Sequence, residues 1–127
     1  MDGARGNKVD HKTTINELKE KVKKFCEDRD WNQFHGAKEL AIGITTESSE
    51  LLDKFRFKSE KEIEEMFKTK KKEEISEELV DTLYFILRFA QKYNIDLTTE
   101  VNKKLEKNNK KYPIEKSKGN NKKYTEL

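Results

Sequence analysis

The stretch EEISEELVDTLYFILRFAQKYN, residues 73–94, decides the fold of this chain. After Ile75 its apolar residues lie almost all round a helix, a pattern typical of a helix in the middle of a bundle. The chain shows no sustained strand-like alternation, its only proline is Pro113, and no glycine occurs between Gly43 and Gly119. We therefore expect an all-α fold, an antiparallel bundle of about four main helices.

The other helices are expected from apolar spacing and from capping residues at their starts. The expected elements are a helix to about residue 28 after Thr13 or Thr14, a second over about 37–57, a short one over about 60–68 after Ser59, and a last one to about 111 after Thr98 or Thr99. Segments 29–36 and 68–72 are expected to be loops. Pro113 ends the last helix because proline cannot continue one.

Composition indicates a single small domain with a thin core. Of 127 residues only 32% are hydrophobic while 42% are charged, which favours a helical bundle completed by oligomerisation. We expect a disordered segment over 1–12, a helical domain over 13–116 and a mobile basic tail over 117–127. The single Cys26 excludes an intrachain disulfide, no stretch is long and apolar enough for a membrane span, and a cytoplasmic protein is the default expectation.

Two pairs of carboxylates stand inside the apolar runs. Glu47 and Glu50 form the first pair and Glu78 and Asp81 the second, each with the i, i+3 spacing that puts both side chains on nearly one helix face. Carboxylates gathered in a partly dry cleft repel one another unless a cation neutralises them. Oxygen ligands without histidine or cysteine favour Mg²⁺, with Mn²⁺ as a substitute. A ferritin-like site is disfavoured because neither pair is followed by a Glu-x-x-His ligand.

Such a site suits phosphoanhydride chemistry, with Mg²⁺ polarising a phosphoryl oxygen and one carboxylate orienting the attacking water. We assign that general base to Glu50. Cationic and polar groups for the phosphates are available on the last expected helix, where Lys104, Asn108 and Lys111 share a face. In most proteins these three residues alone would be a solvated surface, and a single acidic pair would be as well.

The chain resembles the MazG-like superfamily of all-α nucleoside triphosphate pyrophosphohydrolases, and within it the dCTP pyrophosphatase group. The resemblance covers about residues 25–127. It is carried by residues 27–35 (EDRDWNQFH), the Glu47 and Glu50 pair ahead of 51–57 (LLDKFRF), residues 77–81 (EELVD), residues 104–113 (KLEKNNKKYP) and the terminal residues 123–127 (KYTEL).

The resemblance implies hydrolysis of a (deoxy)nucleoside triphosphate to the monophosphate and pyrophosphate. The implied Mg²⁺ ligands are Glu47, Glu50, Glu78 and Asp81, the implied phosphate contacts are Lys104 and Asn108, and the implied base pocket involves Trp31, Gln33, Phe34 and His35. It also implies a homotetramer, or a dimer, in which helices of neighbouring subunits complete the site. Without the resemblance, Trp31 and Phe34 would be expected simply to seal a core.

Three departures from the dCTP-selective members bear on the substrate. Phe57 stands where they carry a second pocket tryptophan, Phe85 where they carry a tyrosine, and Val22 where they carry a histidine. Phenylalanine keeps a stacking face but lacks the indole N–H or phenol O–H, and losing such hydrogen bonds changes selectivity. The expected substrate is dCTP or a modified dCTP.

Two other classes of function are compatible with the composition. One is a noncatalytic helical protein–protein interaction module whose Lys/Glu surfaces pair with another chain. The other is a nucleic-acid-binding helical domain that uses the C-terminal lysines, although a formal net charge of +3 is weak support for it and no nucleic acid is expected.

Overall fold

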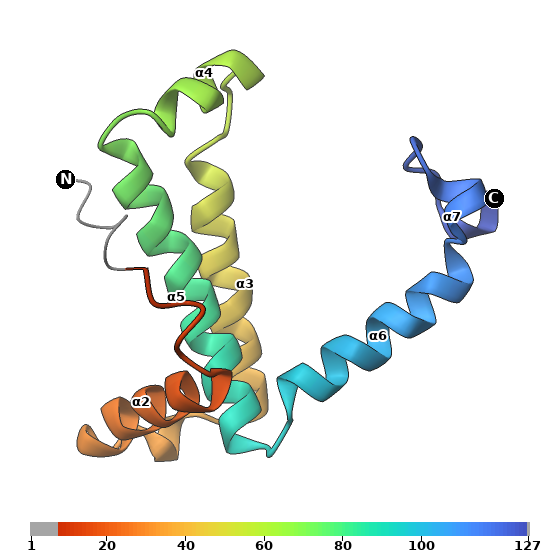
Figure 1. Ribbon diagram of the computed structural model, residues 1–127. Helices are drawn as coiled ribbons and strands as arrows, with labels where there is room; N and C mark the ends of the chain where they lie inside the picture. The colour runs from red at the N-terminus through yellow and green to blue at the C-terminus, as the bar shows by residue number, and fades with distance from the viewer. Residues whose placement is uncertain (1–7, 127) are drawn as a thin grey trace. The chain divides into compact units, whose positions relative to one another are not determined.

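The computed structural model describes residues 8–126, and every regular element in that range is a helix. The elements are α2 (Ile15–Asp28), the 3₁₀ turn η1 (Asn32–Phe34), α3 (Ala37–Asp53), α4 (Glu60–Met66), α5 (Lys71–Lys92), α6 (Leu97–Lys111), α7 (Ile114–Ser117) and the 3₁₀ turn η2 (Tyr124–Glu126). They form two compact units that divide after Asn94 (Figure 1). The expected all-α fold is confirmed.

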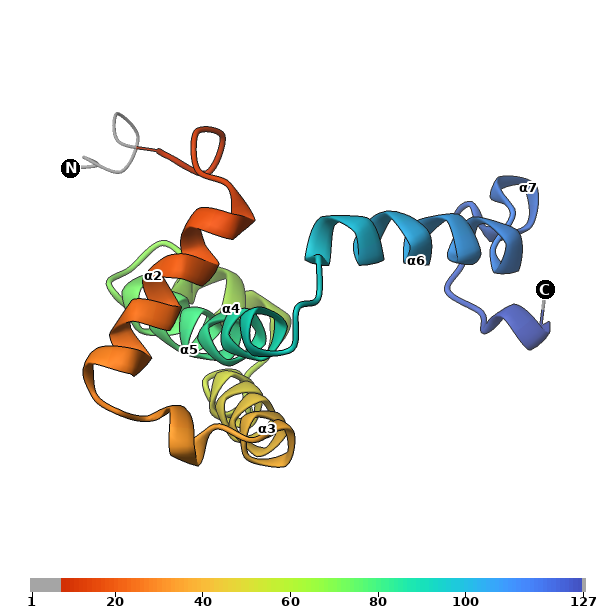
Figure 2. The same ribbon diagram turned by 90° about the horizontal axis from the view of Figure 1, so that it is seen from below.

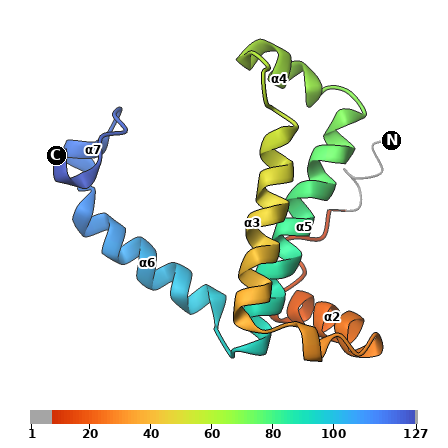
Figure 3. The ribbon, with the colours of Figure 1, turned by 180° about the vertical axis from the view of Figure 1, so that it is seen from behind.

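The first unit is built on an antiparallel pair, α3 and α5, joined at one end by α4 (Figure 1 and Figure 3). α2 packs against α5 near the other end of the pair (Figure 2). The buried apolar side chains of the described chain come from these four helices and are Cys26, Leu40, Met66, Ile75, Leu87 and Ala90. This core is as thin as the composition indicated.

The starts of two helices follow the predicted capping residues. Thr14 accepts a hydrogen bond from the amide of Glu17, whose carboxylate accepts from the Thr14 amide. Ser59 and Glu62 form the same reciprocal arrangement at the start of α4. Each box satisfies two backbone N–H groups that a helix start leaves without a partner.

Other boundaries differ from expectation. α3 ends at Asp53 instead of continuing to about 57, because residues 54–57 form a turn with i to i+3 hydrogen bonds such as that from the Phe55 amide to the Leu52 carbonyl. Phe57, at the end of this turn, adopts a left-handed backbone with φ of 62°. α5 begins at Lys71, inside the expected 68–72 loop. The predicted cap of α6 is wrong: Asp96, and neither Thr98 nor Thr99, is the cap, and its carboxylate accepts from the Thr99 amide. α7 follows Pro113 as an additional short helix.

The surroundings of α5 also differ from expectation within the first unit. Leu79 and Val80 are each 57% exposed and Leu83 is exposed as well, because α2 and α3 cover only part of the helix. Residues 1–7 of the predicted disordered segment lie outside the described residues, and the domain boundaries stay predictions. None of the helices described has the length and apolar character needed to cross a bilayer.

The second unit begins at Ile95 and contains α6, α7 and η2. On α6, Lys104, Asn108 and Lys111 occur at the i+4 and i+3 steps that put them on one side of the helix.

Candidate active site

Three carboxylates meet where α3 and α5 run side by side. Glu47 and Glu50 come from α3 and Glu78 from α5, and one carboxylate oxygen of each lies within 4.8 Å of the others. The antiparallel pairing of the two helices brings together pairs that are about thirty residues apart in sequence. Asp81 is exposed and lies outside this three-residue cluster, although its charge acts on Glu47 and Glu78.

The cluster is electrostatically unfavourable on its own. Burial raises the pKa of Glu47, and the carboxylates of Glu50, Asp81 and Glu78 raise it further. Burial also raises the pKa of Glu78, helped by the adjacent Glu50 and by Asp81 and opposed by the ammonium of Lys54. One oxygen of Glu78, Oε2, is buried without a hydrogen-bond partner. A cation would relieve both the repulsion and this unpaired buried oxygen.

The donor set fits a hard divalent cation. The cluster offers only carboxylate oxygens, which Mg²⁺ and Mn²⁺ prefer, and no cysteine or histidine belongs to it. Glu47, Glu50 and Glu78 would hold the ion, with Asp81 close enough to contribute charge. The divalent metal expected from the sequence is therefore compatible with the geometry.

An aromatic pocket adjoins the carboxylates. It has a volume of about 330 Å³ and is lined by Phe25, Trp31, Glu47, Asp81, Tyr84 and Phe85. The rings meet edge to face, with centroids 5.7 Å apart for Phe25 and Trp31, 6.1 Å for Phe25 and Tyr84, and 5.0 Å for Tyr84 and Phe85. Edge-to-face contacts of this kind stabilise a rigid apolar wall. Two acids and an aromatic wall therefore share one cavity.

Two close contacts shape the wall of this pocket. The hydroxyl of Tyr84 lies 3.1 Å from the thiol of Cys26, which is fully buried. The ring of Phe85 lies over α3 at Gly43, where an added Cβ would come within 2.7 Å of it. Glycine at position 43 is therefore what allows the Phe85 ring to lie this close to α3.

The remaining predicted base-pocket residues lie elsewhere. Gln33 donates its amide to the carbonyl and the carboxylate of Asp30, and Phe34 is 62% exposed. His35 Nδ1 accepts a hydrogen bond from Arg88. Phe57 is 93% exposed beneath the guanidinium of Arg56 and does not line the aromatic pocket.

Two pocket residues were missed by sequence reasoning. Phe25 ends the apolar stripe of the first helix, and Tyr84 follows Asp81 by three positions, so both lay in recognised helices. Their positions in an apolar stripe gave no sign that they face the carboxylates. Lys54 was missed too, and lines a pocket of about 400 Å³ with Glu50, Asp53 and Glu78.

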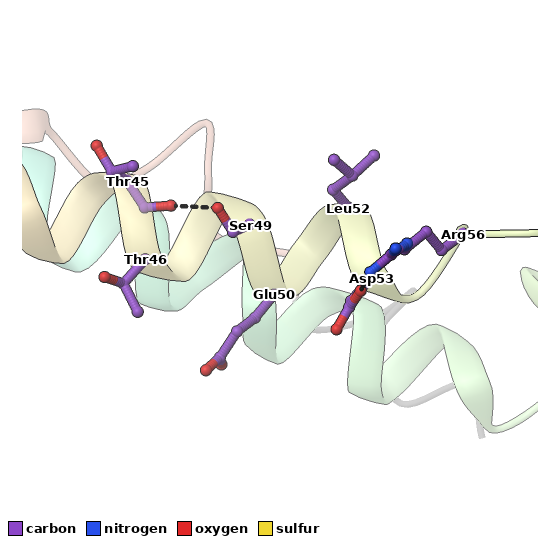
Figure 4. A pocket seen from close by; sticks show the side chains of 7 residues that line it. All are labelled: Thr45, Thr46, Ser49, Glu50, Leu52, Asp53 and Arg56. Carbon is purple, nitrogen blue, oxygen red and sulfur yellow. Dashed lines mark hydrogen bonds and ion pairs between the residues drawn. The ribbon is translucent and has the colours of Figure 1, made fainter.

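A further pocket of about 590 Å³ follows one side of α3 (Figure 4). Its lining residues are Thr45, Thr46, Ser49, Glu50, Leu52, Asp53 and Arg56. The hydroxyl of Ser49 donates to the carbonyl of Thr45, and Asp53 pairs with Arg56 at 3.5 Å. Glu50, which lines this pocket, is exposed to the solvent.

The family model described as the MazG-like family matches residues 42–127, more than half of the chain and a range that includes all four acids. The chain belongs to the MazG-like family. Curated relatives of this MazG-like chain include dCTP pyrophosphatase 1 of Rattus norvegicus, 31% identical over 90% of this chain and 68% of the relative. The Mus musculus dCTP pyrophosphatase 1 is 30% identical over 98% of this chain and 74% of the relative.

A solved structure has a fold similar to that of this MazG-like chain. A pyrophosphatase from Archaeoglobus fulgidus superposes with a TM-score of 0.73 at 34% identity, covering 78% of this chain and 92% of that protein. The predicted family is confirmed, as is the predicted enzyme class, a nucleotide pyrophosphohydrolase.

Proposed function

We propose that this MazG-like chain is an Mg²⁺-dependent nucleoside triphosphate pyrophosphohydrolase that hydrolyses dCTP or a modified dCTP to the monophosphate and pyrophosphate. The observation that carries the proposal is that Glu47 belongs both to the carboxylate cluster and to the lining of the aromatic pocket. A nucleotide has a matching shape, since its planar base is separated from its polyanionic tail by the sugar. The names of the curated relatives support dCTP as the substrate.

The reaction attacks the α-phosphorus with water and breaks its bond to the bridging oxygen, so that pyrophosphate leaves. When bound, Mg²⁺ supplies charge neutralisation at the phosphates and lowers the pKa of a coordinated water. Glu47, Glu50 and Glu78 would hold the cation where α3 and α5 run side by side, with Asp81 contributing charge. Glu50, which solvent reaches, orients the attacking water and accepts its proton.

The aromatic wall recognises the base by contact with rings and by exclusion of water. Trp31 and Phe85 offer faces and edges for stacking, and neither Phe25 nor Phe85 can donate a hydrogen bond. Lys104 and Asn108, with Lys111 beside them, bind the phosphate tail. We also propose that the protein is a homotetramer in the cytoplasm, as the family resemblance implies.

The decisive experiment measures pyrophosphate release from a panel of canonical and modified nucleoside triphosphates, with and without Mg²⁺. Wild-type protein should release pyrophosphate fastest from dCTP or a modified dCTP and only with the metal. Glu47→Gln removes one ligand charge at nearly constant volume and should lower kcat/KM by at least about 100-fold while leaving the helical content unchanged. Glu65→Gln, an exposed acid on α4 paired with Lys68, is the matched control and should be silent.

Near-normal turnover in Glu47→Gln would contradict the assignment of the metal site. Release of orthophosphate instead of pyrophosphate would move the reaction to a terminal phosphorus and overturn the proposed activity.

A further inference from the structure

A buried arginine connects α5 to the segment that carries Trp31. Arg88 is only 1% exposed, and the partners of its guanidinium are neutral. Its Nε donates to His35 Nδ1 at 3.1 Å, one terminal nitrogen donates to Asn32 Oδ1 at 3.0 Å, and the other donates to Gln91 Oε1 at 2.6 Å. Two of these three acceptors belong to the short segment between α2 and α3.

A charge buried at this depth is costly unless its donors are satisfied. The fork of N–H groups on a guanidinium fixes two acceptors in a defined geometry, which a lysine cannot do. Arg88 sits on the long helix α5, while its acceptors Asn32 and His35 belong to the short segment between α2 and α3, so that α5 is the support on which this segment is held.

Lys92, one turn further along α5, reinforces the same attachment. Its ammonium donates to the backbone carbonyl of Asn32 at 2.9 Å and to that of His35. At the other end of the segment, the Trp31 amide donates to the carbonyl of Cys26 at 3.0 Å. The segment is therefore held at both ends, with Trp31 at the start of the part that Arg88 anchors.

His35 connects Arg88 to Trp31, because it contacts both side chains. The two rings meet edge to face with centroids 6.2 Å apart, and Trp31 is a wall of the aromatic pocket. Since Arg88 donates to Nδ1, that nitrogen is unprotonated and its role is to accept from Arg88. The base contact that the family resemblance implied for His35 is thus not available to this atom.

We propose that Arg88 is a positioning residue for nucleotide recognition, which acts through His35 and Asn32 to hold Trp31 as a wall of the base pocket. The part of this inference that concerns substrate rests on the proposed function. The part that concerns Trp31 does not, because the contacts of Arg88 with His35 and Asn32 are made between protein groups alone.

Trp31 is the only tryptophan of the chain, so its fluorescence reports on this segment directly. The test compares wild type with Arg88→Met, which keeps the length of the side chain but removes its donors, and with Arg88→Lys. In the metal-free protein, acrylamide quenching of Trp31 should increase by at least about 1.5-fold in Arg88→Met and less in Arg88→Lys. Lys24→Met removes one positive charge at an exposed position of α2 and should leave the quenching unchanged.

The kinetic readout separates base recognition from the phosphate site. The KM for the preferred nucleotide should rise at least about fivefold in Arg88→Met with kcat within about twofold. Inorganic tripolyphosphate, which has no base, should inhibit the variant and the wild type with the same Ki. A general structural weakening would instead raise the KM for the nucleotide and the Ki for tripolyphosphate together.

His35→Phe keeps the ring beside Trp31 but removes the acceptor, and tests the same attachment if Arg88→Met does not fold. It should increase Trp31 quenching in the same direction. Unchanged quenching in a folded Arg88→Met, or in His35→Phe, overturns the positioning role. If wild type releases no pyrophosphate, the proposed function fails while the quenching comparison still decides whether Arg88 positions Trp31.

Discussion

Gly43 shows how one missing side chain shapes the pocket, and replacing it gives a sharp prediction. Alanine in a helix is favoured over glycine by about 1 kcal/mol, but overpacking a contact costs about 1–3 kcal/mol. The new Cβ in Gly43→Ala would meet the Phe85 ring at 2.7 Å, and that ring is already packed against Tyr84. We expect a net destabilisation of about 1 kcal/mol in urea unfolding, together with a raised nucleotide KM because Phe85 is displaced.

Gly36→Ala adds the same methyl group at a position where no atom lies within 4 Å, and serves as the control. Its effect should be confined to the start of α3, with the KM unchanged. A Gly43→Ala variant more stable than wild type, with unchanged KM, would show that Phe85 moves freely and does not define the pocket wall.

His35 should make the stability of the fold depend on pH. Burial lowers the pKa of His35 below its ordinary 6.5, and the charges of Arg88 and Lys92 lower it further. A lowered histidine pKa means that the unfolded chain binds the proton more readily, so this contribution is complete above pH 6.5 and is lost as pH falls towards the folded-state pKa. Between pH 7.5 and 5.5 the free energy of unfolding in urea should fall by up to about 1 kcal/mol more in the wild type than in His35→Gln.

The comparison with His35→Gln is needed because Glu47 and Glu78 act in the opposite sense. Their raised pKa values make the metal-free protein more stable as pH falls, since protonation relieves their repulsion. The difference in pH dependence of the free energy of unfolding between wild type and His35→Gln isolates the contribution of His35. An identical pH dependence in both proteins would contradict the hydrogen bond between Arg88 and a neutral His35.

At the scale of elements, the start of α6 depends on Asp96. Its carboxylate accepts from the Thr99 amide at 3.1 Å, which satisfies one of the free N–H groups of the helix start. Asp96→Ala should destabilise α6 by about 1 kcal/mol, seen as faster hydrogen exchange in its first turn. Thr98→Ala, one of the two caps expected from sequence, should leave exchange unchanged. The reverse result would restore the sequence-based assignment.

Local signals explain which boundaries the sequence predicts. Thr14 and Ser59 were identifiable because the cap and its glutamate partner lie within four residues of each other. Asp96 was missed because Thr98 and Thr99 are also good caps, so that composition alone does not choose among the three. α3 ends in a turn over residues 54–57 that contains neither glycine nor proline, and a left-handed Phe57 is a conformation that a phenylalanine gives no reason to expect.

The same distinction between local signals and tertiary packing applies to the candidate active site. The i, i+3 spacing identifies the acids in the sequence. The antiparallel arrangement of α3 and α5 is then enough to bring the two acidic pairs together. The pocket residues Phe25 and Tyr84 depend on how α2 is rotated against α5, which is set by tertiary packing. Arg88 lies in an otherwise apolar run, and its acceptors Asn32 and His35 come more than fifty residues earlier, so no local pattern reveals its role.

For the whole molecule, the exposed apolar face of α5 supports the proposed tetramer. Leu79, Val80 and Leu83 are exposed and, at i, i+1 and i+4 spacing, lie on one side of a helix whose other side is packed, and such patches mark interaction surfaces. Sedimentation equilibrium should give a mass four times the 15.1 kDa of the chain. Leu79→Lys places a charge in this face and should shift the protein to smaller species.

Asn16→Lys adds the same charge at an exposed position of α2 and should leave the assembly intact. A wild-type protein that sediments as a monomer at all concentrations would contradict the tetramer, and would leave the apolar face of α5 without its proposed partner.

Because Cys26 is buried in contact with Tyr84, the rate at which a reagent labels its thiol reports on motion at the pocket. A thiol reagent reaches Cys26, the only cysteine of the chain, only when α2 moves away from α5. At low reagent concentration the labelling rate follows the population of the open form, and at saturating concentration it follows the rate of opening. A molecule that occupies the pocket would then slow the alkylation of Cys26. This effect can be measured in the chain without any substitution.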